Sequence, residues 1–285
     1  GDVGVRRGEV SAAAGAPRWM LFCESAGDFR TVETLVDELL RLWCAAWVHD
    51  VLDRNPADAR RWWHHQGTTS WYDLHRVYDD ADDLDVRRHH GHFAGVPGLP
   101  GAVMLDTMFR IVRKVHGRAA AAERPNAVMV LWDADAQGYS RRMGLDQALA
   151  AGVTLPEGVA HVVALAEPER EAWVLAGFDP EDEDEEAALH ACRTDLGYAP
   201  HEHAHRLSAG SGEATDDSKR VLGALCATAE RERLCLRIPD HERRTVLVKR
   251  GKDSGLATWI THVEDRLLPQ VDPAVVARLL DERAP

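Results

Sequence analysis

Carboxylates follow two apolar runs of this chain, in a pattern suited to holding a divalent cation. Glu24 directly follows the run WMLFC, and Asp133 and Asp135 end the run AVMVLWDAD. Three uncompensated carboxylates that lie close together cannot all stay ionised without a cation. Carboxylate oxygens suit hard divalent ions. The sequence therefore predicts a Mg²⁺ or Mn²⁺ site, provided that the fold brings these three residues together.

The elements that must position these acids alternate between strand and helix. Apolar runs predict strands over residues 19–24, 127–135 and 161–166, with HHGHF (89–93) as a candidate fourth. Apolar residues at helical spacing predict helices from Thr31 onward, capped by Asp28 or Thr31, over 100–115, and over 141–151. Such alternation is typical of a parallel sheet with helices on both faces, whose ligands bind beyond the carboxyl ends of the strands.

The length of 285 residues fits one large domain or two small ones. Residues 1–17 are small, polar and aperiodic, which indicates a disordered or vector-derived lead. Residues 18–178 form the predicted sheet domain, with a helical insertion at about 47–86. Residues 179–285 form a predicted C-terminal α/β extension.

Within this extension, the acidic run DPEDEDEE (179–186) is a solvated helix start or a loop. A polar loop follows over 197–214, and a helix is predicted over about 216–233. The run TVLVK (245–249) alternates and predicts a strand. Two helices complete the chain, the last one opened by Asp272-Pro273.

Charge and composition limit the possible functions. Lys and Arg number 34 against 47 Asp and Glu, a net charge of −13, which opposes unassisted binding to a phosphate backbone. No apolar run approaches the roughly 20 residues of a membrane span and no secretion signal opens the chain, so a cytoplasmic protein without a membrane partner is expected. Without C-x-x-C spacing, the cysteines are expected to be buried and reduced; they are Cys23, Cys44, Cys192, Cys226 and Cys235.

The segments LFCESAGDFRTVETL and VLWDADAQGYSRR resemble the glutamate and D-x-D motifs of the Toprim fold, which topoisomerases, bacterial primases and OLD-family nucleases share. The resemblance covers roughly residues 19–166. It implies that Glu24 is a catalytic general acid or base and that Asp133 and Asp135 are metal ligands. Looser matches, at AEPEREAWVLAGFDP, at HRLSAG with Lys219, and at Lys249 with GLATWI, are similar to small bacterial Toprim-like proteins that accompany ATPases.

In the nuclease branch that the chain resembles, further acids hold a second metal and a Lys or Arg steadies the charge on the phosphate. Glu169 and Glu171, just past the 161–166 strand, are either second-site ligands or acids favoured by a helix N-terminus. Asp28 is either a metal-site acid or only a cap. Lys249 either points at the same edge as a catalytic cation or is a surface residue.

These features together predict a Toprim-type metal-dependent nuclease acting on DNA more than on RNA. The resemblance also implies an ATPase partner and a role in anti-phage defence, and an oligomer is possible. A regulatory or non-catalytic subunit of a nucleic-acid-processing complex is the alternative.

HEHAH (201–205) matches the H-E-x-x-H pattern, in which a helix places two His ligands of a zinc peptidase on one face. Pro200 before the motif and Gly210 and Gly212 after it argue against such a helix. A zinc peptidase is therefore a minor alternative. His89, His90 and His92 are expected to be strand or loop residues rather than ligands.

Overall fold

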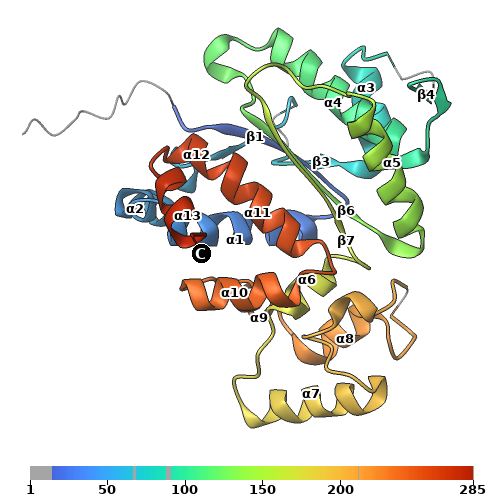
Figure 1. Ribbon diagram of the computed structural model, residues 1–285, viewed down its shortest axis with the longest axis vertical. Helices are drawn as coiled ribbons and strands as arrows, with labels where there is room; N and C mark the ends of the chain where they lie inside the picture. The colour runs from blue at the N-terminus through green and yellow to red at the C-terminus, as the bar shows by residue number, and fades with distance from the viewer. Residues whose placement is uncertain (1–14, 67–68, 88–90, 211, 285) are drawn as a thin grey trace, which may run out of the picture.

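A parallel sheet lies at the centre of the molecule (Figure 1). The computed structural model describes residues 15–66, 69–87, 91–210 and 212–284. The three long strands β1 (Arg18–Cys23), β6 (Ala127–Asp133) and β7 (Ala160–Ala166) lie side by side in that order, all parallel. The predicted α/β class with a mostly parallel sheet is therefore confirmed. Because β1 and β6 are neighbours, their carboxyl ends meet at the same edge.

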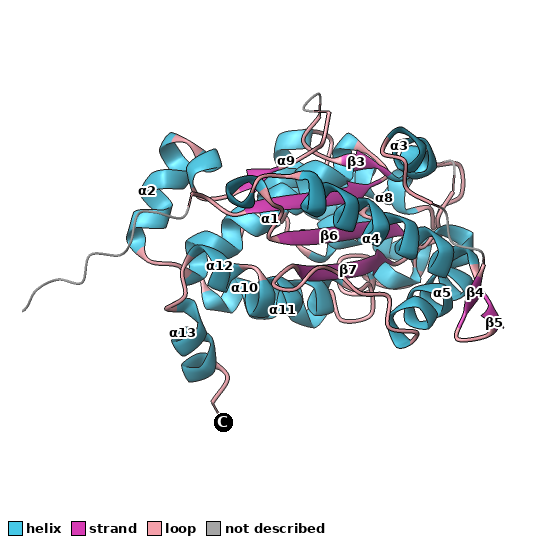
Figure 2. Cartoon of the chain, turned by 90° about the horizontal axis from the view of Figure 1, so that it is seen from above, coloured by secondary structure: helices cyan, strands magenta, loops and turns pink. Residues whose placement is uncertain are grey.

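Each face of the sheet is covered by helices, as the view in Figure 2 shows. Alternate residues of β1 point to opposite sides: Trp19 and Leu21 join one core, Met20 and Phe22 the other. The first core is completed by α1 (Ala26–Trp43), α6 (Glu171–Ala176) and α11 (Leu256–Arg266). The second is completed by α3 (Val77–Asp83), α4 (Pro100–Arg118) and α5 (Gly138–Ala150). Burial on both faces explains why these strands are continuous apolar runs.

The insertion predicted at 47–86 contributes strands as well as helices. It contains α2 (Ala46–Arg54) and α3, and also the short strands β2 (Arg61–Trp62) and β3 (Tyr72–Asp73). Both strands pair in parallel with β1, one after the other. Two-residue strands are too short to show a period of two, so the sequence pattern could not predict them.

The candidate strand HHGHF does not join the central sheet. Within it, β4 (His92–Phe93) pairs antiparallel with β5 (Val96–Pro97) in a separate ribbon. His89 and His90 lie outside the described residues. The prediction of a fourth strand in the sheet at this position is therefore wrong.

Helix α1 begins at Ala26, earlier than predicted, because Ser25 is its N-cap. The Ser25 hydroxyl accepts the Asp28 N–H, and the Asp28 carboxylate accepts the N–H groups of Glu24 and Ser25. This is a capping box, in which Asp28 is the third helical residue. The prediction that Asp28 or Thr31 is the cap itself is wrong.

The segment that was predicted as an α/β extension is helical. The run TVLVK lies inside α10 (His241–Arg250), so the predicted strand is wrong. Asp240 caps this helix by accepting the Arg243 N–H, and only Leu247 of the helix is buried. The cap at Asp240 and the burial of Leu247 therefore favour a helix here more than the short alternation of TVLVK favours a strand. The helix expected over 216–233 is two helices, α8 (Ser218–Leu225) and α9 (Ala229–Cys235).

The other helices of this segment are α7 (Glu183–Leu196), α12 (Leu268–Val271) and α13 (Val275–Glu282). Figure 1 shows that α7 and α8 lie beyond the ends toward which the strands point. Leu247, Trp259 and Leu279 belong to the same hydrophobic core as Trp19 of β1. Residues on both sides of the predicted boundary at 178–179 therefore share one core. Among the described residues, no helix is long and apolar enough to cross a membrane.

Candidate metal centre

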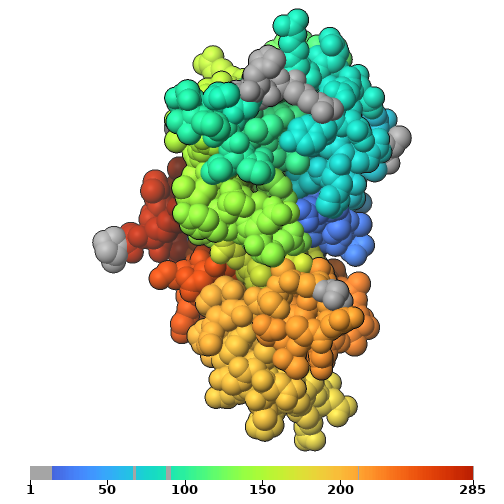
Figure 3. Space-filling view, turned by 90° about the vertical axis from the view of Figure 1, so that its right-hand side faces the viewer, coloured from blue at the N-terminus to red at the C-terminus, as the bar shows by residue number. Residues whose placement is uncertain are grey.

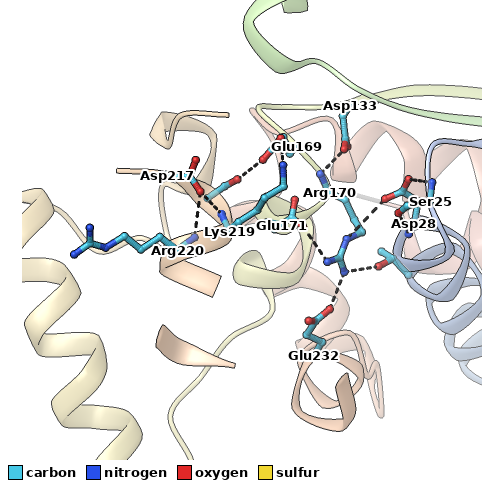
Figure 4. Close-up of polar contacts among 12 residues, drawn as sticks. Ser25, Asp28, Asp133, Glu169, Arg170, Glu171, Asp217, Lys219, Arg220 and Glu232 are labelled. Atoms are coloured by element: carbon cyan, nitrogen blue, oxygen red, sulfur yellow. Dashed lines mark hydrogen bonds and ion pairs between the residues drawn. The ribbon is translucent and has the colours of Figure 1, made fainter. Parts of the chain in front are cut away.

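Three carboxylates converge at the carboxyl edge of the sheet. Asp133 ends β6, Asp135 opens the short helix that follows, and Glu169 lies in the loop after β7. Each offers one oxygen, and the three oxygens lie within 4.8 Å of one another. Figure 4 shows Asp133 in contact with the backbone N–H of Arg170, and Glu169 in contact with the ammonium group of Lys219.

Backbone contacts bring the loops after β6 and β7 together. The Arg170 N–H donates to Asp133 Oδ1 at 2.8 Å, and the Asp135 N–H donates to the Pro168 carbonyl at 2.9 Å. Asp135 has a φ of 49°, in the left-handed region that residues other than glycine seldom adopt. Such backbone strain is common at functional sites, where surrounding contacts maintain it.

Arg141 connects Glu24 to this cluster. Its Nη1 atom lies 2.8 Å from Asp135 Oδ2 and 3.7 Å from Glu24 Oε1, and it also donates to the Asp133 carbonyl. The guanidinium carbon lies 4.8 Å from the centroid of the Trp132 ring. Glu24 therefore stands beside Asp135, as expected for acids at the ends of neighbouring strands.

Glu169 is held by the first turn of α8. Its Oε1 accepts a hydrogen bond from Lys219 Nζ and its Oε2 accepts one from the Ser218 hydroxyl, both at 2.6 Å. Only 3% of Glu169 is exposed. Asp217 caps α8 by accepting the N–H groups of Lys219 and Arg220, which fixes the position of this turn.

Asp28 and Glu171, two predicted metal-site acids, pair with Arg170 instead (Figure 4). The Arg170 side chain lies 3.0 Å from Glu171 and 2.8 Å from Glu232, and its Nε lies 3.8 Å from Asp28. Asp28 also completes the capping box of α1. These two carboxylates therefore do not face the cluster of Asp133, Asp135 and Glu169. They hold the side chain of Arg170 and the first turn of α1 in place beside it.

Burial and neighbouring acids disfavour the charged forms of two key carboxylates. Burial, reinforced by Asp28 and Glu171, raises the pKa of Asp133 to about 8. Burial and the negative charge of Asp135 raise the pKa of Glu24. The six predicted site carboxylates face three cations, Arg141, Arg170 and Lys219. The all-oxygen donors and the excess of negative charge fit a hard divalent cation.

Lys249 is not brought to this cluster. It lies exposed in the last turn of α10, and within the described ranges no hydrogen bond or ion pair joins it to any of the six acids. Lys219 is the ammonium group at the site. Lys219 and Glu169 are 50 positions apart in the chain, so no local spacing signal could have paired them. Arg141, in contrast, lies within the motif VLWDADAQGYSRR.

HEHAH does not form the helix that a zinc peptidase site requires. His201 and Glu202 lie in a turn, and a short 3-10 helix, Ala204–Arg206, follows. His201 and His205 therefore do not share one face of an α-helix.

No protein-family model, curated protein or solved structure matches the chain. Fold and site together define a class: an α/β protein with a carboxylate cluster beyond the carboxyl ends of parallel strands. This edge is where ligands bind in open parallel sheets.

Proposed function

We propose that the protein is a Toprim-type nuclease that hydrolyses phosphodiester bonds with Mg²⁺ or Mn²⁺. The convergence of Asp133, Asp135 and Glu169 within 4.8 Å, next to Glu24, is the observation that carries the proposal. These residues come from the ends of three neighbouring strands, so the rigid sheet holds them in place.

Asp133, Asp135 and Glu169 would hold the cation, since each presents an oxygen to the same small region. A bound divalent cation would polarise the phosphate and stabilise charge on the attacking and leaving oxygens. Arg141 bridges Asp135 and Glu24 and so keeps both carboxylates oriented.

Glu24 is suited to proton transfer. Its side chain is partly exposed, so a water molecule can reach it, and its raised pKa favours the protonated form more than in an ordinary glutamate. Glu24 would therefore take a proton from the attacking water or deliver one to the leaving oxygen. Lys219, whose side chain is half exposed and whose ammonium pairs with Glu169, would face the phosphate in the role first predicted for Lys249.

The substrate is proposed to be nucleic acid, with DNA favoured over RNA, and an ATPase partner would deliver it. The net charge of −13 opposes tight binding of a polyanion by the chain alone. A partner with a positive surface would supply the missing attraction. A role of such a complex in defence against phage is part of the same proposal.

The test combines metal binding with cleavage. We expect Mn²⁺ to raise the melting temperature of the protein, since a ligand of the folded state stabilises it. Asp133→Asn and Glu169→Gln should abolish this rise and also plasmid nicking in Mn²⁺. Asp146→Asn is the matched control, because Asp146 is an exposed acid of α5. An unchanged response to Mn²⁺ in Asp133→Asn would show that the site is misplaced.

A regulatory subunit without catalysis is the second candidate. It is favoured by the contacts of Arg141 and Lys219, which already compensate Asp135 and Glu169 without a metal ion. Metal binding without plasmid nicking, by the chain alone and with proteins co-purified from its host, would support this candidate over the nuclease.

A further inference from the structure

Two cysteines on the side of the molecule that carries α8 and α9 lie within reach of each other. The Sγ atoms of Cys226 and Cys235 are 3.6 Å apart. Cys226 follows the last residue of α8 and Cys235 is the last residue of α9. Both residues are buried, with exposed fractions of 4% and 0%. Figure 3 shows this segment in orange, bordering the green α5 region on one face of the molecule.

The surroundings of Cys235 favour a thiolate. Arg231 Nη1 lies 3.8 Å from Cys235 Sγ, and two hydrogen bonds to Glu185, at 2.6 and 2.8 Å, fix that guanidinium. The hydrogen bond from Cys226, together with Arg231 and Arg243, lowers the pKa of Cys235 despite burial. The thiolate is the reactive form of cysteine, so the guanidinium of Arg231 beside its sulfur favours Cys235 as the nucleophile of the pair.

The other cysteines have different surroundings. Burial raises the pKa of Cys44 to about 12, and burial also raises the pKa of Cys23 and of Cys192. Of the described sulfur atoms, only those of Cys226 and Cys235 lie within hydrogen-bond distance of each other. Reactivity toward an oxidant is therefore expected to concentrate at this pair.

We propose that Cys226 and Cys235 form a dithiol site that hydroperoxides oxidise to a disulfide. The Cys235 thiolate attacks one oxygen of hydrogen peroxide and becomes a sulfenic acid, and the released hydroxide takes up the former Cys235 proton to form water. The Cys226 sulfur then attacks the Cys235 sulfur and the S–S bond forms. The hydroxyl group leaves with the Cys226 proton as a second water, so two thiols are oxidised and one peroxide is reduced.

Closing the disulfide requires the two sulfur atoms to approach by about 1.5 Å, from 3.6 Å to a covalent bond length. Helix α9 has seven residues, of which Ala229, Glu230 and Arg233 are exposed, and closure of the disulfide requires its last turn to shift. Glu232 lies one turn before Cys235 on α9 and pairs with Arg170 at 2.8 Å. Formation of the disulfide would therefore shift the helix whose Glu232 pairs with Arg170. The backbone N–H of Arg170 in turn contacts Asp133.

The experiment equilibrates the full chain with reduced and oxidised glutathione, once folded and once unfolded in urea. Free thiols are then alkylated, and disulfides are identified by peptide mass spectrometry. We expect Cys226–Cys235 as the main disulfide, with an effective concentration at least about tenfold higher in the folded chain, because folding positions the two sulfurs. Treatment of the folded chain with hydrogen peroxide should yield the same bond.

Cys192→Ser is the matched control and should leave this disulfide unchanged, whereas Cys226→Ser and Cys235→Ser should abolish it. The comparison of folded with unfolded wild-type chain does not depend on the folding of any variant. A different main pairing, or an effective concentration in the folded chain no higher than in urea, would overturn the proposal. So would peroxide treatment of the folded chain that leaves the pair reduced. None of these measurements involves nuclease activity.

Discussion

The side chains at the end of the sheet differ in what each carboxylate faces. Asp133, Asp135 and Glu169 face one another, whereas Asp28 and Glu171 face the guanidinium of Arg170. The first group gains most from a divalent cation, since its members repel one another at short range. Both carboxylates of the second group pair with Arg170, so they contribute by holding Arg170 and, through the Arg170 N–H, Asp133.

Asp133 makes folding stability depend on pH when no metal is bound. Its folded pKa of about 8 lies above the unfolded value of 3.8, so the folded state binds the proton more tightly. The resulting stabilisation is complete below the unfolded pKa and is lost as the pH rises through 8. Asp133→Asn keeps the acceptor for the Arg170 N–H and removes the charge.

We therefore expect Asp133→Asn in EDTA to be more stable than the parent at pH 8, by up to about 5 kcal/mol, and equally stable at pH 4. Urea unfolding across this pH range measures the difference. A constant difference between pH 4 and pH 8 would contradict the assigned pKa.

Lys219 compensates a carboxylate that is almost fully buried. In Lys219→Met, Glu169 would keep the Ser218 hydroxyl and lose its ammonium partner. Because Lys219 is half exposed, we expect a loss of about 1–3 kcal/mol in EDTA, below the cost of breaking a fully buried pair. Added Mn²⁺ should restore part of this loss.

Lys249→Met is the matched control for Lys219→Met, since Lys249 is exposed on α10. Urea unfolding of both variants, with and without Mn²⁺, makes the comparison. An equal loss in the two variants would show that the Lys219–Glu169 pair is not responsible.

At the scale of elements, the approach of α11 to the end of β7 depends on one glycine. Gly255 is the N-cap of α11, with a φ of 87°, and a Cβ added there would lie 2.2 Å from the Leu165 carbonyl oxygen. An L side chain is strained at this φ and would displace backbone as well. Gly255 therefore allows α11 to begin directly against the last residues of the edge strand.

We expect Gly255→Ala to destabilise the protein by about 2–4 kcal/mol, through backbone strain and the collision with Leu165. Gly223→Ala in α8 is the opposite case, since a Cβ there meets nothing within 4 Å. It should raise stability by about 0.5–1 kcal/mol through helix propensity. Thermal unfolding of the two variants measures these changes in stability. A Gly255→Ala protein as stable as the Gly223→Ala protein would contradict the close approach of α11 to β7.

The whole molecule combines an acidic surface with a site proposed to act on a polyanion. We expect a chain of net charge −13 to release few counterions from DNA on binding and therefore to have a low intrinsic affinity for it. The cations around the acidic cluster are already paired with carboxylates, Arg141 with Asp135 and Lys219 with Glu169. We therefore propose that a partner protein delivers the substrate.

We expect the isolated chain to cleave plasmid weakly in Mn²⁺, and cleavage to fall as KCl rises from 25 to about 200 mM, because salt screens what attraction remains. Proteins co-purified from the native host should increase cleavage strongly at the higher salt. Nicking assays over the salt series, with Asp133→Asn as the blank, make the measurement. Fast cleavage by the chain alone at the highest salt would contradict this expectation.

The long strands and the positions of their terminal acids could be predicted from sequence. Strands β1, β6 and β7 are buried on both faces, so each is a continuous apolar run that local inspection detects. Glu24 and Asp133 follow from where these runs end. The strand at 245–249 was predicted wrongly because four alternating residues fit a half-buried helix as well as a strand.

The sequence by itself determined the parallel α/β class and the place of Glu24, Asp133 and Asp135 at strand ends, because hydrophobic periodicity is a local property. Only the tertiary structure decided which charges meet. It paired Asp28 and Glu171 with Arg170, Glu169 with Lys219, and left Lys249 exposed. Apart from the pair of sequence neighbours Arg170 and Glu171, these pairs join residues from different elements, so they depend on how helices pack beyond the sheet, which no spacing along the chain encodes.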